Sequence, residues 1–223
     1  MSIEISLLFL ESVLLVVTIV LLFFSLREGR HRDKLLVEIV KTAKILTRQE
    51  YFLTVIDTMI EAESEVVGCI TGRMPRGDDI KRTREITATI ERLVKKGVRV
   101  EYLMPRFPDR LHVGYLYTKA GAEVRYSSCL MVHNLRFMIA DDRVVIIGIP
   151  EVVGEKEATK KGHSIPSEGL AIVLKNYFNN CEKQINFADY VKEVLKQTGA
   201  TPKHLASELQ IDEEELLKIA DNR

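Results

Sequence analysis

MVHNLRFMIADDRVVIIGIPE, residues Met131–Glu151, contains two apolar runs separated by a short polar segment. The runs are Arg136–Ala140 and Val144–Gly148, and Asp141-Asp142-Arg143 lies between them. Aspartate is favoured in tight turns because its short side chain can hydrogen-bond nearby backbone groups. The pattern therefore predicts a β-hairpin, and it indicates that a β-sheet forms the centre of the domain.

On both sides of this hairpin, short β-branched runs alternate with segments of helical spacing. We expect further strands at Val66–Thr71, Arg99–Met104, Glu123–Tyr126 and Leu170–Leu174. We expect helices at about Asp78–Lys96, Leu111–Ala120 and Asn176–Lys196, and a polar surface loop at Glu151–Ser167. Strands that alternate with helices are typical of a layered α/β domain, so the fold class is expected to be α/β.

The N-terminus contains a long apolar segment, Ile5–Leu26, that is interrupted only by Glu11 and a few hydroxyl side chains. About 20 apolar residues suffice for a helix to cross a bilayer, so residues 1–28 are predicted to be a transmembrane anchor. Basic residues follow directly, and none precede the segment. They are Arg27, Arg30, Arg32 and Lys34. This bias predicts a single-pass protein of the cell membrane whose C-terminal part is cytoplasmic.

The remaining chain is expected to have three parts. Residues 29–63 lack Gly and Pro from Asp33 onward and have helical spacing, which predicts a neck helix. This neck would form either a short coiled coil or a helix that packs on its own domain. Residues 64–197 are assigned to the α/β domain and 198–223 to a short helical tail. The spacing of Asp212 and Glu215 predicts a capping box, and an acidic tail favours packing or partner docking over DNA binding.

The composition favours no particular class of partner. Lys and Arg together number 32, as do Asp and Glu, so no overall charge favours nucleic acid. Cys69, Cys129 and Cys181 lack the spacing of a metal or redox motif, and we expect them to be reduced. No cofactor or metal is expected.

The hairpin segment resembles the signature of the phospholipase D-like superfamily. In that family an HxKxxxxD motif lies on a strand, a hairpin turn follows, and the next strand ends in a GSxN-type motif. The segments KKGVRVEYLMP, AGAEVRY and PSEGLAIVL are also similar to the family's arrangement, and the resemblance spans about residues 51–190. It implies a phospholipase D-like mixed β-sheet flanked by helices.

The family's reaction uses a histidine that attacks the phosphodiester phosphorus, a lysine that holds the phosphoryl oxygens, and an aspartate that supports the histidine. Here Arg136 matches the lysine and Asp141 the aspartate, whereas Asn134 occupies the position of the histidine. His133 is one residue out of register, and on a strand this would turn its side chain to the opposite face. Gly148-Ile149-Pro150-Glu151 also lacks the usual serine and asparagine. The motif is therefore degenerate.

Other residues are candidates for binding phosphate. Arg73 and Arg76 follow the first predicted strand of the domain, and ligands collect at such strand ends. Arg136 can bind phosphate through two hydrogen bonds. Glu168 matches an acidic residue of the family. His163 is either a second source of imidazole or a solvent-exposed loop histidine.

The sequence favours a non-catalytic binding, scaffolding or sensing module, tethered to the bilayer by residues 5–26. The alternative is a membrane-anchored phosphodiesterase, either a nuclease or a phospholipase D-type hydrolase. Because the chain has a single motif copy, such an enzyme would work as a homodimer. The expected partners are the bilayer, a second copy of the chain, and a phosphate-bearing ligand or a protein.

Overall fold

A computed structural model describes residues 17–18, 43–150 and 159–221 of this chain. Apart from residues 17–18, the described residues belong to one compact unit that begins at residue 43, here called the second unit. The predicted anchor and the first part of the predicted neck lie outside the described residues, apart from Val17 and Thr18. Within the described part of the chain, no helix has the length and apolarity needed to span a membrane.

The second unit is built on one eight-stranded sheet with the strand order β1-β7-β6-β5-β2-β3-β4-β8. The strands are β1 (Lys44–Thr47), β2 (Glu65–Cys69), β3 (Arg99–Pro105), β4 (Glu123–Ser127), β5 (Arg136–Ala140), β6 (Val144–Pro150), β7 (Thr159–Pro166) and β8 (Ile185–Asn186). β2, β3 and β4 pair in parallel, and the remaining pairs are antiparallel. The sheet is therefore mixed, as expected.

The predicted hairpin is confirmed. β5 and β6 pair with Arg136 opposite Gly148 and Ala140 opposite Val144. In the turn, Asp141 and Asp142 have φ values of 51° and 55°. This left-handed region is one that aspartate tolerates better than most residues other than glycine, which explains the choice of residues at the turn.

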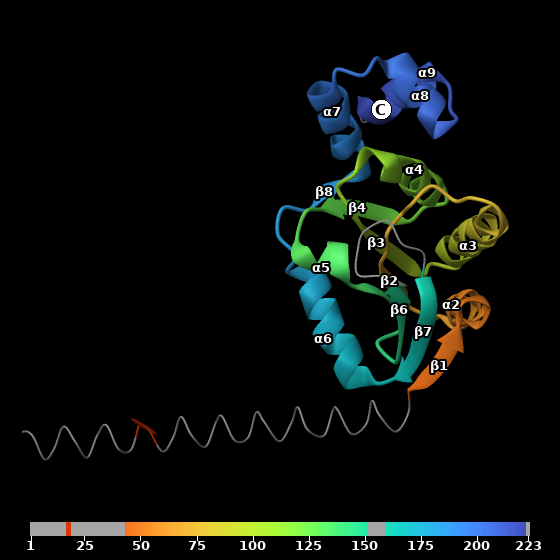
Figure 1. The fold of residues 1–223 in the computed structure, drawn as a ribbon, viewed down its shortest axis with the longest axis vertical. Coiled ribbons are helices and arrows are strands. Elements are labelled where there is room, and N and C mark those ends of the chain that lie inside the picture. Colours follow the sequence, from red (N-terminus) through yellow and green to blue (C-terminus); the bar gives the residue numbers. More distant parts are fainter. Residues whose placement is uncertain (1–16, 19–42, 151–158, 222–223) are drawn as a thin grey trace, which may run out of the picture. The chain divides into compact units, whose positions relative to one another are not determined.

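Helices cover both faces of the sheet (Figure 1). They are α2 (Arg48–Glu61), α3 (Asp78–Lys95), α4 (Leu111–Lys119), α5 (Leu130–Asn134), α6 (Glu168–Asn179), α7 (Phe187–Thr198), α8 (Pro202–Leu209) and α9 (Glu213–Ala220), with a 3₁₀ turn at Pro108–Arg110. Helices α2, α3, α4, α7, α8 and α9 contribute to the larger hydrophobic core, and α5 and α6 contribute to the smaller core on the opposite face. The domain thus has three layers.

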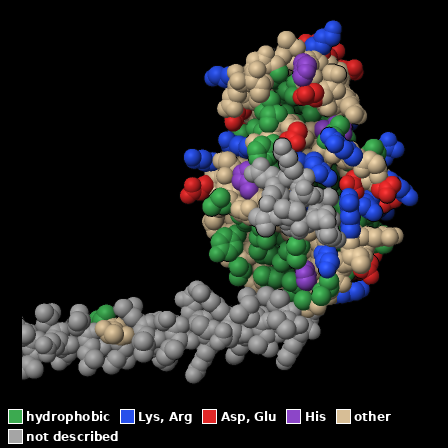
Figure 2. All heavy atoms as spheres, viewed as in Figure 1, with side chains coloured by type: hydrophobic (Ala, Val, Ile, Leu, Met, Phe, Trp, Pro, Cys, Tyr) green, Lys and Arg blue, Asp and Glu red, His purple; other side chains and the backbone are tan. Residues whose placement is uncertain are grey.

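Three segments differ from their predicted structure. Leu170–Leu174 was expected to be a strand, but it belongs to helix α6. The buried residues of this helix are Ala171, Leu174 and Phe178, which follow the helical period, whereas Ile172 and Val173 are exposed. Figure 2 shows hydrophobic side chains gathered on the surface where α6 lies. The predicted loop at 151–167 contains strand β7. The predicted helix Asn176–Lys196 is not continuous: it is divided between the end of α6 and most of α7, with the short strand β8 between them.

The start of the unit also differs from the expected continuous neck helix. Residues Lys44–Thr47 form the edge strand β1, and Thr47 then caps helix α2 in a capping box with Glu50. Tyr51, Val55 and Met59 of α2 are buried in the larger core. Residues 43–63 are therefore part of the α/β unit, which agrees with the packed rather than the coiled-coil alternative for this segment.

The C-terminal tail packs on the domain. Leu205, Leu209 and Leu216 are buried in the larger core, and the Tyr115 hydroxyl donates a 2.6 Å hydrogen bond to the Glu215 carboxylate. Asp212 precedes α9, but its side chain makes no capping hydrogen bond, so the expected capping box is absent there. These contacts support a packing role for the tail.

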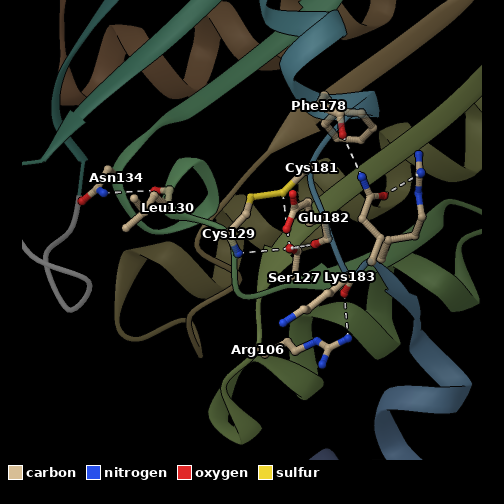
Figure 3. Close-up of a disulfide and its surroundings, with 11 residues drawn as sticks. Arg106, Ser127, Cys129, Leu130, Asn134, Phe178, Cys181, Glu182 and Lys183 are labelled. Carbon is tan, nitrogen blue, oxygen red and sulfur yellow. Dashed lines mark hydrogen bonds between the residues drawn. A yellow bond between two sulfur atoms is a disulfide. The ribbon is translucent and has the colours of Figure 1, made fainter.

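The expectation that all cysteines are reduced is wrong. Cys129 and Cys181 form a disulfide, and their Cα atoms are 6.2 Å apart. Figure 3 shows this bond joining the N-terminus of α5 to the chain after α6, beside Ser127. The pairing was missed because 52 residues separate the two cysteines, and only the packing of α5 and α6 on the same face brings them together. Cys69 is free and buried.

Asp141 has a structural role at the start of β2. Its carboxylate accepts hydrogen bonds from the backbone N–H groups of Glu63, Ser64 and Glu65, at 2.8, 2.8 and 3.0 Å. Burial opposes ionisation of the carboxyl, but these hydrogen bonds outweigh it and lower the pKa of Asp141 to about 2. The carboxylate thus ties the hairpin turn to the preceding loop.

We expect Asp141→Asn to lower the free energy of unfolding by about 1 kcal/mol at pH 7, a value reduced for solvent screening at this half-exposed site. Because the folded pKa lies below the ordinary value of 3.8, the stabilisation is present above pH 4 and is lost as the pH falls toward 2. Urea unfolding of both proteins at pH 7 and pH 2.5 checks this. Asp57→Asn, on the exposed side of α2, is the control. A difference between wild type and Asp141→Asn that does not shrink with falling pH would contradict the assignment.

Candidate functional site

A cavity of about 150 Å³ lies beside the C-terminal end of β2, between the sheet and helices α2 and α3. Four arginines are among the residues that line it: Arg48, Arg73, Arg82 and Arg136. We call it the arginine cavity. Its position agrees with the general rule that ligands bind at the carboxyl ends of parallel strands.

Arg136 reaches the arginine cavity because of its position on β5. Side chains alternate along a strand, and Phe137 and Ile139 point into the smaller core. Arg136 and Met138 therefore point to the opposite face, where α2 lies, and only 7% of Arg136 is exposed. Burial lowers the pKa of Arg136, and the nearby charges of Arg73 and Arg110 lower it further. The cavity thus concentrates positive charge in a partly desolvated place.

Asp79 lies among the arginines of α2 and α3. One guanidinium nitrogen of Arg48 is 2.9 Å from both Asp79 carboxylate oxygens, and Arg82 donates to the same carboxylate at 3.1 Å. Arg82 also lies over the Phe52 ring, 4.8 Å from its centroid. Arg76 lines a groove formed with Arg48, Asp79 and Arg82, next to the arginine cavity.

His133 is not among the residues that line the arginine cavity. It lies on helix α5, where its ring meets the Phe107 ring edge-on with centroids 5.4 Å apart. Asn134, which occupies the position of the family's histidine, is exposed and donates its side-chain amide to the Leu130 carbonyl. The predicted direction of the His133 side chain required β5 to extend back to residue 133, but the strand begins at Arg136. A helical turn, rather than a one-residue slip on a strand, sets the direction of His133.

Asp141 and Glu168 lie at the far end of the hairpin from Arg136. Asp141 follows β5, five residues or roughly 17 Å of extended chain beyond Arg136. Glu168 is exposed at the start of α6, directly after Ser167, whose N–H donates to the Arg143 carbonyl in the hairpin turn. His163 lies on β7 opposite Ile147, and it is half-buried. The structure therefore brings Arg73 and Arg136 together and places the two acidic candidates elsewhere.

Sequence reasoning missed most of the other residues in the arginine cavity. Arg48 and Tyr51 come from α2, Arg82 from α3, Tyr102 from β3 and Tyr117 from α4. These residues share no local motif, because three helices and a strand contribute them separately. The signal in the sequence for this region was the pair Arg73 and Arg76 after the first predicted strand.

The arginine cavity has the chemistry of an anion-binding site. Guanidinium groups form charge-assisted hydrogen bonds with phosphate or carboxylate oxygens, and low exposure strengthens them. Among residues 43–150 and 159–221, no group of His, Cys, Asp and Glu side chains is arranged to hold a metal ion. Cys69 lies near Arg136, but burial raises the pKa of its thiol to about 12, so it stays protonated and a poor nucleophile.

Similarity to known proteins was found in structure and not in sequence. No protein-family model matches the sequence, and no curated protein matches it. Nuc from Salmonella typhimurium, a phospholipase D family member, superposes with a TM-score of 0.50 at 13% identity, covering 65% of this chain and 97% of Nuc. NucT from Helicobacter pylori gives 0.49 at 13% identity, covering 65% of this chain and 98% of NucT.

A phosphatidylserine synthase from Haemophilus influenzae Rd KW20 gives a TM-score of 0.47 at 17% identity, covering 81% of this chain and 45% of the synthase. At these identities, structural likeness concerns the fold alone. The expected likeness of the fold is supported by the Nuc superposition: over the 65% of this chain that it covers, the mixed α/β fold is like that of a phospholipase D family member.

Proposed function

We propose that this chain is a non-catalytic module that binds a phosphate-bearing ligand in the arginine cavity, on a phospholipase D-like fold. One observation carries the proposal: Arg73 and Arg136 both line the arginine cavity, whereas His133 is not among its lining residues. Phosphate is held best by guanidinium groups that donate in pairs. Phosphodiester cleavage of the family's kind also requires an imidazole on the same phosphorus.

The other motif residues support a binding role. The Asp141 carboxylate accepts backbone hydrogen bonds at the opposite end of β5 from Arg136. It is therefore not placed to support an imidazole beside Arg136. His133 packs against Phe107. A binding module needs the cation of the motif and not the nucleophile. The cation, Arg136, is the motif residue that faces the cavity.

We expect Arg136→Gln to weaken phosphate binding by about 10- to 100-fold, because a charge-assisted hydrogen bond contributes about 1.5–3 kcal/mol. Isothermal titration calorimetry with inorganic phosphate and pyrophosphate, on the full-length chain in detergent micelles, measures this. Arg84→Gln is the matched control, since Arg84 is exposed on α3 and is not among the residues that line the cavity. Equal losses in the two variants would indicate nonspecific attraction and would contradict the proposal.

The proposed lack of catalysis is tested separately. Incubation of the same protein with bis(4-nitrophenyl) phosphate, single-stranded DNA, RNA and phosphatidylcholine should give no turnover above the blank. Turnover that His133→Ala abolishes would overturn the proposal in favour of a homodimeric phosphodiesterase.

We further propose that residues 5–26 tether the module to the bilayer with the α/β unit on the cytoplasmic side. The apolar length of this segment and the basic residues that follow it support the proposal. Retention in the membrane pellet after alkaline carbonate extraction, and a fluorescent rather than a phosphatase-active C-terminal reporter, are the expected results.

A further inference from the structure

The arginine cavity has a buried aromatic side. Tyr51, Tyr102 and Tyr117 come from α2, β3 and α4, and they are 9%, 3% and 5% exposed. The Tyr102 and Tyr117 rings lie with centroids 5.0 Å apart, and Phe52 also lines the cavity. A ligand that enters from the arginine side therefore meets a wall made largely of rings.

The tyrosine hydroxyls give this wall hydrogen-bonding capacity. The Tyr102 hydroxyl donates to the Met59 sulfur at 3.8 Å. For Tyr51 and Tyr117, the structure gives no hydroxyl hydrogen bond to any residue within 43–150 or 159–221. Burial raises the pKa of Tyr51 to about 12 and that of Tyr117 further, so both phenols stay protonated at neutral pH. Buried hydroxyl groups normally have a hydrogen-bond partner. The Tyr51 and Tyr117 hydroxyls are therefore available to form hydrogen bonds with a ligand in the cavity.

The size of the cavity limits the ligand. At about 150 Å³ it matches the volume at which an apolar protein cavity accepts one benzene-sized ring. A polymer such as DNA, or a phospholipid with two acyl chains, would have to leave most of its volume outside the cavity.

We propose that the ligand is a small phosphate monoester of a single ring, with the ring against Tyr51, Tyr102 and Tyr117 and the phosphate on Arg136 and Arg73. The inference deepens the proposed function and rests on it. The tyrosine hydroxyls donate to a polar atom on the ring, and the arginines neutralise the phosphate. Both ends of the ligand are therefore recognised by groups that face one cavity.

The test compares three probes on the full-length chain by isothermal titration calorimetry: inorganic phosphate, phenyl phosphate and 4-nitrophenyl phosphate. We expect phenyl phosphate to bind at least 10-fold more tightly than inorganic phosphate, because the ring is transferred from water into the aromatic wall. We expect 4-nitrophenyl phosphate to gain about a further threefold to tenfold, because its nitro oxygens can accept hydrogen bonds from the phenols.

Two variants separate the parts of the site. Tyr117→Phe keeps the ring and removes the hydroxyl, so it should erase the gain of the nitro compound over phenyl phosphate. Arg136→Gln should weaken all three probes. Far-ultraviolet circular dichroism and thermal unfolding verify that each variant is folded.

The outcomes distinguish this inference from the proposed function. If the three probes bind equally, the ring specificity is wrong while phosphate binding stands. If a single-stranded DNA dodecamer binds more tightly than phenyl phosphate, the ligand is a polymer and the inference is overturned. If none of the probes binds, the proposed function itself fails.

Discussion

Replacing Cys129 and Cys181 together by serine is expected to lower the free energy of unfolding by about 4 kcal/mol. The bond closes a loop across a sequence separation of 52 residues, and the chain-entropy model assigns about this value to a loop of that length. The disulfide also fixes α5, because Cys129 is its N-cap residue and α5 has five residues. A helix this short depends on tertiary contacts rather than on its own hydrogen bonds.

Urea unfolding of the full-length chain, followed by circular dichroism with and without dithiothreitol, measures the effect. Dithiothreitol should destabilise the wild type and have no effect on the double variant. Cys69→Ala is the control, since Cys69 is a free thiol and its variant should keep the response to dithiothreitol. A wild type that is insensitive to dithiothreitol would show that the bond does not stabilise the unit.

The same bond bears on the proposed cytoplasmic location. Outside hyperthermophiles, disulfides are rare in the reducing cytosol. Cys129 and Cys181 are both half-buried, which limits access of a reductant to the sulfur atoms. Alkylation of free thiols in intact cells, compared with the result of the topology reporter, would show whether the bond persists in the cell and whether it agrees with the proposed location.

Gly114→Ala is expected to lower the free energy of unfolding by about 2–3 kcal/mol, although alanine is the better helix former by about 1 kcal/mol. A Cβ atom at this position on α4 would lie 1.8 Å from the Tyr126 hydroxyl and 3.3 Å from the Phe187 ring. Tyr126 cannot easily move away, because its ring packs 4.4 Å from that of Tyr190. The steric cost therefore exceeds the gain in helix propensity.

A double-mutant cycle isolates the cause. Tyr126→Phe removes the hydroxyl and its long hydrogen bond to the Arg110 carbonyl, so alone it should cost about 1 kcal/mol. In the Gly114→Ala background the same change should be neutral or stabilising, which gives a coupling energy of at least about 1 kcal/mol. If the two changes in the free energy of unfolding simply add, the Tyr126 hydroxyl is not the group that clashes with the new Cβ atom.

Local patterns in the sequence were sufficient for the hairpin and for most of the sheet. The apolar runs on either side of Asp141-Asp142-Arg143 predicted β5 and β6, and the turn residues adopt the left-handed conformation that aspartate tolerates. The same kind of signal misidentified Leu170–Leu174. An apolar run of five residues suits a strand or a buried helix equally, and only the packing of Ala171 and Leu174 against the sheet decides between them.

The sequence by itself determined the α/β class, the hairpin and the presence of an arginine where the motif has a lysine. Tertiary structure alone decided that Arg136 and Arg73 line one cavity beside three tyrosines, and that Cys129 bonds to Cys181. It also decided that His133 lies on a helical turn and not among the residues that line this cavity. The physical reason is that spacing along the chain specifies local hydrogen bonding and side-chain direction within one element. A cavity and a disulfide instead depend on how separate elements pack, and no single segment contains that information.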